Sequence, residues 1–311
     1  MTLHPIRSQL RKLISLPIVD GFDKKLLRKF ISWLYPLDPA EDWHFEGIIP
    51  YGEDMLIAVD TTNWPGWNIF CFGFYSKHLD TIFSSIVADG DIVFDVGANI
   101  GDTTLLLAKQ TGRMGKVYAF EPLPVVNRIL RFNSTLNGME QIRIFDYALA
   151  DSEGQATLQY PTPGKTFSPM VGRSGITGSA SLGDFDRTDA PDCPLQSITV
   201  ECTTLDTVAH SENIESLRLI KIDVEGFDCR VIEGARNTIR KFRPFIIFEY
   251  NHHWERRGGR KLRDALAVLE DYTLYGMVSR GRRSFQKIVD PNSFKGGDIL
   301  AVPLSDQELQ S

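Results

Sequence analysis

Apolar residues follow a regular alternation of two spacings from about residue 78 onward. Short apolar runs rich in β-branched and aromatic residues are separated by segments whose apolar positions recur every three or four residues. The first pattern is typical of buried strands, and the second of helices that cover a sheet. Their alternation predicts an α/β fold with a mostly parallel sheet and helices on both faces. The expected strands are 92–97, 116–122, 142–150, 217–225 and 244–250, with a closing pair at 274–279 and 297–304, and the expected helices are 78–88, 102–111, 124–137, 227–241 and 260–271.

Two stretches of the chain depart from this alternation. Residues 1–77 are predicted to form an N-terminal extension or cap. In it, an amphipathic helix over 24–34 precedes an aromatic-rich stretch, 36–76, whose prolines indicate turns and short strands. Residues 151–200 interrupt the main domain, 78–311, with a hairpin-like segment and then a loop rich in Gly, Ser, Pro and Asp. A loop of that length inside a compact domain is usually functional or mobile.

The first predicted strand ends at a turn whose residues indicate a ligand site. In an open parallel sheet, ligands bind beyond the carboxyl ends of the strands, near the point where the strand order reverses. Asp95 ends this strand, and Gly97 and Gly101 flank the turn in a G-x-x-x-G spacing, unlike the G-x-G-x-x-G spacing of dinucleotide sites. Asp95 and Asp102, at the start of the next helix, would repel a pyrophosphate. A ligand that carries an ammonium group and hydroxyls fits this turn better.

The second predicted strand ends at Glu121, 26 residues after Asp95, and an acid there can accept hydrogen bonds from both hydroxyls of a ribose. A ribose with a positively charged tail that lacks phosphate describes S-adenosylmethionine. We therefore expect the aminopropyl group near Asp95, the ribose on Glu121, and the adenine near the end of the third strand, around Asp146 and Ala148. The expected cofactor-binding residues are Asp95, Gly97, Ala98, Asn99, Gly101, Glu121, Pro122, Asp146, Ala148 and Asp223.

Composition and charge narrow the range of functions. The chain has 311 residues, of which 42% are hydrophobic, and a formal net charge of −6, so nucleic acid is not an expected partner. Its four cysteines include no CxxC pair, so neither a zinc site nor a redox motif is indicated. Four cysteines in a chain of this length do not suggest a disulfide scaffold, which favours a reducing compartment, here the cytoplasm, and no apolar run is long enough to span a membrane. Residues 1–35 nevertheless carry seven basic and two acidic residues. This charge of +5 indicates either a solvated helix face or a surface that meets a membrane or an acidic partner.

Several motifs together resemble the FkbM family of S-adenosylmethionine-dependent methyltransferases. They are VFDVGANIGDTT, VYAFEPLP, ALADSEGQATL, TTLDTV, LIKIDVEGFDCRVIEGA and PFIIFEYN, which match in order and spacing over about residues 80–251, with Asp228 where a glutamate is more usual. The resemblance implies a class I methyltransferase (Rossmann-like) fold, with a seven-stranded sheet in the order 3-2-1-4-5-7-6 whose seventh strand is antiparallel. It also implies methylation of an oxygen, commonly a hydroxyl of a glycan or natural product. By the family pattern, Asp223, Glu225 and Gly226 lie beside the cofactor and the acceptor.

Acids and histidines at the fourth and fifth strand ends are the candidates for catalysis. A hydroxyl acceptor must lose its proton as it takes the methyl group, so the site needs a base, or at least an anchor for that hydroxyl. Asp223 is the first candidate, and Glu225 either shares this role or only favours the start of the next helix. Glu249, His252 and His253 are rivals, since an imidazole titrates near pH 6.5 and suits a base at neutral pH. No metal site is expected, although Asp223, Glu249 and His252 are the residues that would hold a divalent cation.

The leading hypothesis is an S-adenosylmethionine-dependent O-methyltransferase that acts on a sugar, glycan or natural product. The alternatives are a nicotinamide-dependent oxidoreductase, which the missing G-x-G-x-x-G motif disfavours, and a nucleoside-binding module without turnover. The basic stretch 256–263, with Arg280, Arg282 and Arg283, indicates either solvated surface or an anionic acceptor such as a phosphorylated or uronate-bearing glycan.

Overall fold

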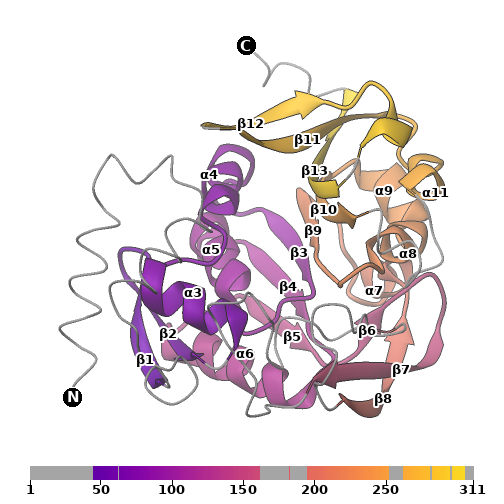
Figure 1. The fold of residues 1–311 in the computed structure, drawn as a ribbon. Coiled ribbons are helices and arrows are strands. Elements are labelled where there is room, and N and C mark those ends of the chain that lie inside the picture. Colours follow the sequence, from indigo (N-terminus) through magenta and orange to yellow (C-terminus); the bar gives the residue numbers. More distant parts are fainter. Residues whose placement is uncertain are drawn as a thin grey trace. The chain divides into compact units, whose positions relative to one another are not determined.

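The structure, a computed structural model, divides into two compact units (Figure 1). The residues that it describes are 45–61, 63–161, 182, 195–251, 262–280, 282–294 and 296–304. The predicted helix over 24–34, His252, most of the insertion loop and the basic residues 256–261 lie outside the described residues, as do the side chains of residues 278–284.

The first unit contains a β-hairpin and a helix. Strands β1 (Glu46–Tyr51) and β2 (Met55–Asp60) pair antiparallel, with alternate residues buried. Helix α3 (Trp64–Phe72) follows, where the sequence predicts only turns and short strands. Asn63 accounts for the difference, because its side chain accepts a hydrogen bond from the N–H of Gly66 at 2.8 Å. This cap and a proline in the first turn both favour the start of a helix.

The second unit is built on an eight-stranded sheet in the order β12-β11-β13-β10-β9-β3-β4-β5 (Figure 1). In this sheet β3, β4, β5, β9 and β10 are parallel, whereas β13 is antiparallel to both β10 and β11. Without β12, this is the order 3-2-1-4-5-7-6 with an antiparallel seventh strand, which confirms the class I methyltransferase fold. The strand count differs by one, because the chain turns back after β11 and adds β12 at the edge. The strands are β3 (Ile92–Val96), β4 (Lys116–Phe120), β5 (Ile142–Phe145), β9 (Leu219–Ile222), β10 (Phe245–Asn251), β11 (Tyr272–Arg280), β12 (Arg282–Lys287) and β13 (Gly296–Pro303).

Helices cover both faces of this sheet (Figure 1). One face carries α4 (Lys77–Ile86), α5 (Asp102–Thr111) and α6 (Pro124–Leu136), and the other carries α7 (Leu205–Ser211), α8 (Asp228–Glu233), α9 (Arg236–Phe242) and α11 (Leu262–Leu266). The larger apolar core lies on the second face, where Phe94, Ile220 and Val231 are fully buried. The predicted helix 227–241 is interrupted at Gly234, where a Cβ atom would lie 2.0 Å from the carbonyl oxygen of Ala150. In the part of the chain that the structure describes, no helix is both long and apolar enough to cross a bilayer.

The strands at the two ends of the insertion form one separate three-stranded sheet, in the order β6-β8-β7. It comprises β6 (Ala148–Leu149), β7 (Gly154–Pro161) and β8 (Leu195–Thr203). The predicted third strand, 142–150, is therefore divided between two sheets: its first part is β5 of the main sheet, and Ala148 and Leu149 pair in parallel with β8.

Candidate functional site

A buried ion pair lies beneath the turn that follows β3. Asp95 is fully buried, and its Oδ2 atom accepts hydrogen bonds from the hydroxyls of Thr103, at 2.9 Å, and Thr104, at 2.6 Å. Its Oδ1 atom lies 3.2 Å from Nζ of Lys221, the residue opposite it on β9. Groups of the protein itself therefore hold the Asp95 carboxylate. In the described structure, Asp95 orders the turn, and its expected proximity to the amine of a ligand stays a prediction.

Lys221 connects this turn to the end of β9. Its ammonium group donates a hydrogen bond to the carbonyl oxygen of Gly97 at 3.2 Å and lies 3.7 Å from Oδ2 of Asp223. Burial alone would lower the pKa of Lys221, but the carboxylates of Asp95, Asp223 and Asp102 outweigh it and raise that pKa. The lysine therefore stays charged and balances the acids around it.

The two glycines of the turn are required by packing within the protein. Gly97 has a φ of 75°, and a Cβ atom there would lie 1.9 Å from the carbonyl oxygen of Asp223. Gly101 has a φ of 94°, and its Cβ would lie 2.6 Å from a methyl carbon of Leu130. Between them, Asn99 also has a positive φ of 52°, an uncommon conformation for a residue with a side chain. The turn is thus held in one tight shape against the end of β9 and the side chain of Leu130 in α6.

Glu121, which follows the end of β4, points toward this turn. Its Oε2 atom accepts a hydrogen bond from the N–H of Asn99 at 3.0 Å, and its Oε1 atom accepts one from the N–H of Leu123 at 2.9 Å. Burial raises the pKa of Glu121 to about 7, although these two N–H groups and the charge of Lys221 oppose the shift. A carboxylate oxygen can accept more than one hydrogen bond, so both oxygens retain capacity for a ligand hydroxyl.

The remaining residues predicted to contact the cofactor lie around the same strand ends. Ala98 is buried in the turn, and Pro122 is half-buried next to Glu121. Asp146 is exposed just beyond β5, whereas Ala148 is buried in the small sheet.

Three carboxylates from adjacent strands form a row on the same face of the sheet as Lys221. Asp223 follows β9 directly, Glu249 lies near the end of β10, and Asp298 lies opposite Glu249 on β13. Residues opposite each other in neighbouring strands project to the same side. We call Asp223, Glu249 and Asp298 the acidic row. Asp298 and Lys221 were not predicted as site residues, although a lysine inside the apolar run LIKI is a sequence signal for a buried ion pair.

Burial and mutual repulsion change the protonation of this row. Burial raises the pKa of Glu249 to about 10, with further contributions from the charges of Asp223, Asp298 and Glu225. The pKa of Asp223 is also raised by partial burial, but the charge of Lys221 opposes that shift. At neutral pH, Glu249 therefore keeps its proton and is able to donate a hydrogen bond, while Asp223, with 39% of its side chain exposed, lies next to the Lys221 cation.

Two further observations concern the predicted catalytic residues. Glu225 lies in the turn between β9 and α8 with a φ of 53°, and strained backbone of this kind is found at functional sites. His252 and His253 lie outside the described residues, so their relation to the row is not defined. Among the residues that the structure describes, no three His, Cys, Asp or Glu side chains converge in a way that would hold a metal ion.

A family model described as the methyltransferase FkbM domain matches residues 95–274, which is more than half of the chain. The chain belongs to the FkbM methyltransferase family. This assignment favours the methyltransferase over the nicotinamide-dependent oxidoreductase and over the module without turnover.

Curated relatives with similar sequences to this FkbM methyltransferase act on different molecules, according to their names. The 2-O-methyltransferase NoeI of Sinorhizobium fredii is 27% identical over 204 residues, which are 64% of this chain and 79% of NoeI. The 31-O-demethyl-FK506 methyltransferase FkbM of Streptomyces tacrolimicus is 32% identical, over 48% of this chain and 61% of the relative. The hexuronic acid methyltransferase AglP of Haloferax volcanii is 25% identical, over 52% of this chain and 56% of the relative.

The residues around the turn fit S-adenosylmethionine, the methyl donor of this FkbM methyltransferase. Glu121 is aimed at the turn and can accept the ribose hydroxyls. Asp223 has a partly exposed carboxylate, and its backbone touches Gly97, so it adjoins the same turn. When bound, S-adenosylmethionine supplies an electrophilic methyl group on a sulfonium centre.

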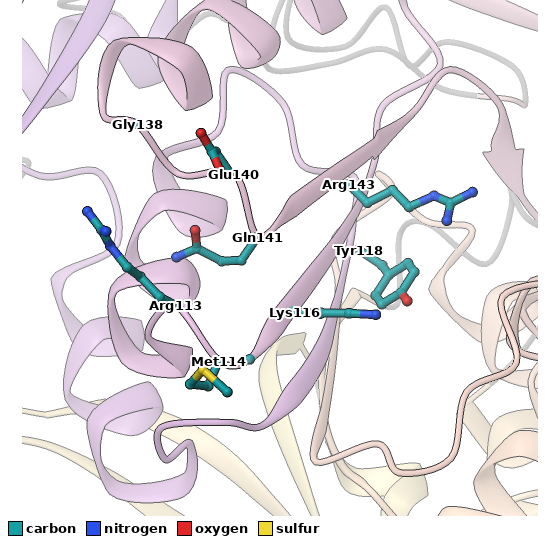
Figure 2. A pocket seen from close by; sticks show the side chains of 9 residues that line it. Arg113, Met114, Lys116, Tyr118, Gly138, Glu140, Gln141 and Arg143 are labelled. Carbon is teal, nitrogen blue, oxygen red and sulfur yellow. The ribbon is translucent and has the colours of Figure 1, made fainter.

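A hollow of about 460 Å³ lies at the other edge of the sheet, around the amino ends of β4 and β5 (Figure 2). It is lined by the cations Arg113, Lys116 and Arg143, but these do not converge. Lys116 and Arg143 extend to one side of the strands and Arg113 to the other (Figure 2). Arg143 also forms an ion pair with Glu212. This hollow is therefore no alternative to the site at the carboxyl ends.

Proposed function

We propose that this FkbM methyltransferase transfers the methyl group to a hydroxyl oxygen of a sugar, either in a glycan or on a natural product. The observation that carries the proposal is the acidic row, which places carboxyl groups from three strand ends beside the cofactor turn. Carboxylates accept hydrogen bonds from hydroxyl groups and can also take up their protons. A row of this kind suits an acceptor with several hydroxyls better than an apolar acceptor.

Asp223 has the geometry of the residue that receives the proton. In an in-line displacement, the acceptor oxygen forms a bond to the methyl carbon while the carbon–sulfur bond breaks and its electron pair remains on sulfur. The proton of the hydroxyl must leave that oxygen in the same step or before it. Asp223 is partly exposed, adjoins Gly97 and is balanced by Lys221 at 3.7 Å, so its carboxylate can be charged beside the reacting atoms.

Glu249 has a different role in this proposal. Since its pKa of about 10 leaves it protonated at neutral pH, it acts as a donor to an oxygen of the acceptor and not as the base. Alignment of the acceptor oxygen, methyl carbon and sulfur can lower the barrier by about 7–11 kcal/mol. Holding the acceptor by both accepting and donating carboxyl groups contributes to that alignment.

The relatives support a hydroxyl-bearing acceptor without naming one for this chain. By their names, one methylates a 2-O position, one an oxygen of FK506 and one a hexuronic acid. Oxygen is the methylated atom in two of these names, and a sugar acid is the acceptor in the third.

The test is transfer of a radiolabelled methyl group from S-adenosylmethionine to a cell-envelope glycan extract. We expect label that resists mild alkali, because a methyl ether survives treatment that hydrolyses a methyl ester. Label released by alkali would indicate methylation of a carboxyl group and would contradict the proposal. At saturating S-adenosylmethionine, the variant Asp223→Asn should lose most of the transfer, typically a factor of about 10²–10⁴ for a missing base.

A further inference from the structure

A histidine from helix α4 reaches the acidic row. Nε2 of His78 lies 2.9 Å from Oδ2 of Asp298, and the two residues are 220 positions apart in the sequence. Both are only partly buried, with 17% of the His78 side chain and 30% of the Asp298 side chain exposed. The pair therefore lies at an accessible edge of the site. It also connects α4 to β13 at the carboxyl end of the sheet.

The pair lies next to the groups that face the acceptor. Asp298 stands directly opposite Glu249 in the β10–β13 pair, and its charge contributes to the raised pKa values of both Glu249 and Asp223. Neighbouring strands are about 4.8 Å apart, so three adjacent strand ends span about 10 Å. That span matches one sugar ring with its hydroxyl groups. Over the described residues, the row is not arranged to enclose a metal ion.

Asp228 adds an independent feature at the same strand ends. Its side chain is 1% exposed, and its Oδ1 atom accepts a hydrogen bond from the N–H of Glu249 at 3.1 Å. Its Oδ2 atom has no hydrogen-bond partner within the described structure. Buried polar atoms are rarely left in this state. Burial raises the pKa of Asp228 to about 7, so this carboxyl group lies beside Glu249 without adding a full negative charge to the row.

We propose that His78 and Asp298 position the methyl acceptor. His78 holds the Asp298 carboxylate beside Glu249, so that the acidic row binds the hydroxyls of an uncharged sugar. The inference rests on the proposed function, since it assigns the acceptor class of that same site. Removing the imidazole frees Asp298 to move, and removing the carboxylate leaves one end of the row without an acceptor for a hydroxyl.

The charge of the row also determines which sugars it selects. Asp223 and Asp298 are both acids, and Lys221 already balances Asp95 as well as Asp223. A uronate brought against Asp298 would meet a like charge at close range, which disfavours its binding. A neutral hexoside has no such penalty and retains all its hydrogen bonds. The described part of the site therefore selects against the class of acceptor named for AglP.

The experiment compares methyl hexosides with the matching methyl hexuronosides as acceptors for purified full-length protein. The variants are Asp298→Asn, His78→Phe and His78→Gln, with Asp271→Asn as the matched control. Asp271 is an exposed acid at the opposite end of the β11–β13 pair, where its ion pair with Arg243 contributes little. For each protein we would measure kcat and KM, acceptor binding to the complex with S-adenosylhomocysteine by saturation-transfer NMR, and the melting temperature.

We expect the wild type to prefer hexosides. Asp298→Asn and His78→Phe should raise KM for hexosides about tenfold or more with a smaller change in kcat, and weaken acceptor binding to match, because a hydrogen bond to a charged group is lost. His78→Gln retains an N–H at a similar reach and should stay near the wild type, as should Asp271→Asn. Asp298→Asn should also reduce the preference for hexosides over hexuronosides.

Two results would overturn the inference while leaving the proposed function intact. One is a wild type that methylates sugars but favours hexuronosides. The other is an unchanged KM and preference in both Asp298→Asn and His78→Phe. If the wild type binds S-adenosylhomocysteine and methylates an acceptor that carries no sugar, the proposed function itself fails, and the inference fails with it.

Discussion

At the scale of single residues, Glu121 offers the most direct test of the cofactor site. One of its carboxylate oxygens accepts a hydrogen bond from the turn after β3 and the other accepts one from Leu123, and both are expected to receive the ribose hydroxyls. Glu121→Gln removes the charge and replaces one acceptor by a donor, so affinity for S-adenosylhomocysteine should fall about 10- to 100-fold, as for other charged hydrogen bonds. Isothermal titration at pH 8, where the carboxyl group is ionised, measures this loss. Glu140→Gln, at the opposite edge of the sheet, serves as the control.

The same residue predicts how binding depends on pH. Because the pKa of Glu121 is about 7 in the folded protein, its carboxylate becomes protonated as the pH falls below that value. A protonated carboxyl group accepts hydroxyl hydrogen bonds less well, so wild-type affinity should decrease from pH 8 to pH 6. This slope should be reduced in Glu121→Gln. Equal affinity of wild type and variant across the range would remove Glu121 from the site.

Lys221 carries a prediction about stability. Its ammonium group is buried against the fully buried Asp95 carboxylate at 3.2 Å. Lys221→Met leaves that carboxylate without a countercharge, and breaking a buried pair in this way costs about 3–5 kcal/mol of unfolding free energy. The double variant Asp95→Asn/Lys221→Met removes both charges and should recover much of the loss in urea denaturation. A double variant as unstable as Lys221→Met alone would show that the loss does not come from an uncompensated Asp95 charge.

At the scale of elements, local patterns predicted most of the main sheet and its helices. Helix α5 begins at Asp102 and ends at Thr111, as expected, because its glycine boundaries and apolar spacing are local signals. The division of 142–150 between two sheets was not predictable, since it depends on pairing with β8, more than fifty residues further along the chain. Helix α3 was missed although the cap at Asn63 was present in the sequence. Aromatic residues are typical of strands, so the composition of that stretch masks its local helix signal.

Some residues of the candidate site were likewise predictable from the sequence, and others were not. Asp95, Glu121 and Asp223 are visible in the sequence, because each lies at the end of an apolar run, and parallel strands bring such ends together. The pairing of His78 with Asp298 is a contact between α4 and β13. No periodicity of either segment predicts it. The shift of Glu249 to a protonated state likewise depends on neighbours from other strands.

The turn after β3 provides the prediction at this scale. Gly97→Ala introduces a Cβ atom 1.9 Å from the carbonyl oxygen of Asp223, so β9 and the turn must separate. Gly138→Ala is the matched control, since Gly138 also has a positive φ, of 61°, but no atom lies within 4 Å of its Cβ position. The control should lose only about 1–2 kcal/mol of stability from its backbone conformation. Gly97→Ala should lose clearly more and should also bind S-adenosylhomocysteine more weakly. Similar urea midpoints for the two variants would contradict the packing.

At the scale of the whole molecule, the carboxyl ends of the sheet concentrate acids that the fold holds in a partly protonated state. Burial raises the pKa values of Asp102, Glu121 and Asp228 to about 7, from ordinary values near 4. In the unfolded chain these groups ionise near pH 4. Between about pH 4 and pH 7, the folded state therefore binds more protons than the unfolded state. By linkage, their contribution to stability is fully present below pH 4 and is lost as the pH rises through 7.

A variant of Asp228 separates this pH dependence of stability from the contributions of the many other acids of the chain. Asp228→Asn resembles the protonated form and retains an oxygen to accept the N–H of Glu249, which Asp228 bonds at 3.1 Å. The wild type must ionise this buried group as the pH rises, whereas the variant does not. In urea denaturation at pH 5, 6, 7 and 8, the variant should therefore gain stability relative to the wild type from pH 5 to pH 7, and the gain should level off between pH 7 and pH 8. A difference that stays constant over this range would mean that Asp228 titrates alike in the folded and unfolded chains. A difference that shrinks would mean that the folded protein favours the ionised form of Asp228. That result would contradict the raised pKa, because burial and the charge of Asp223 both disfavour ionisation there.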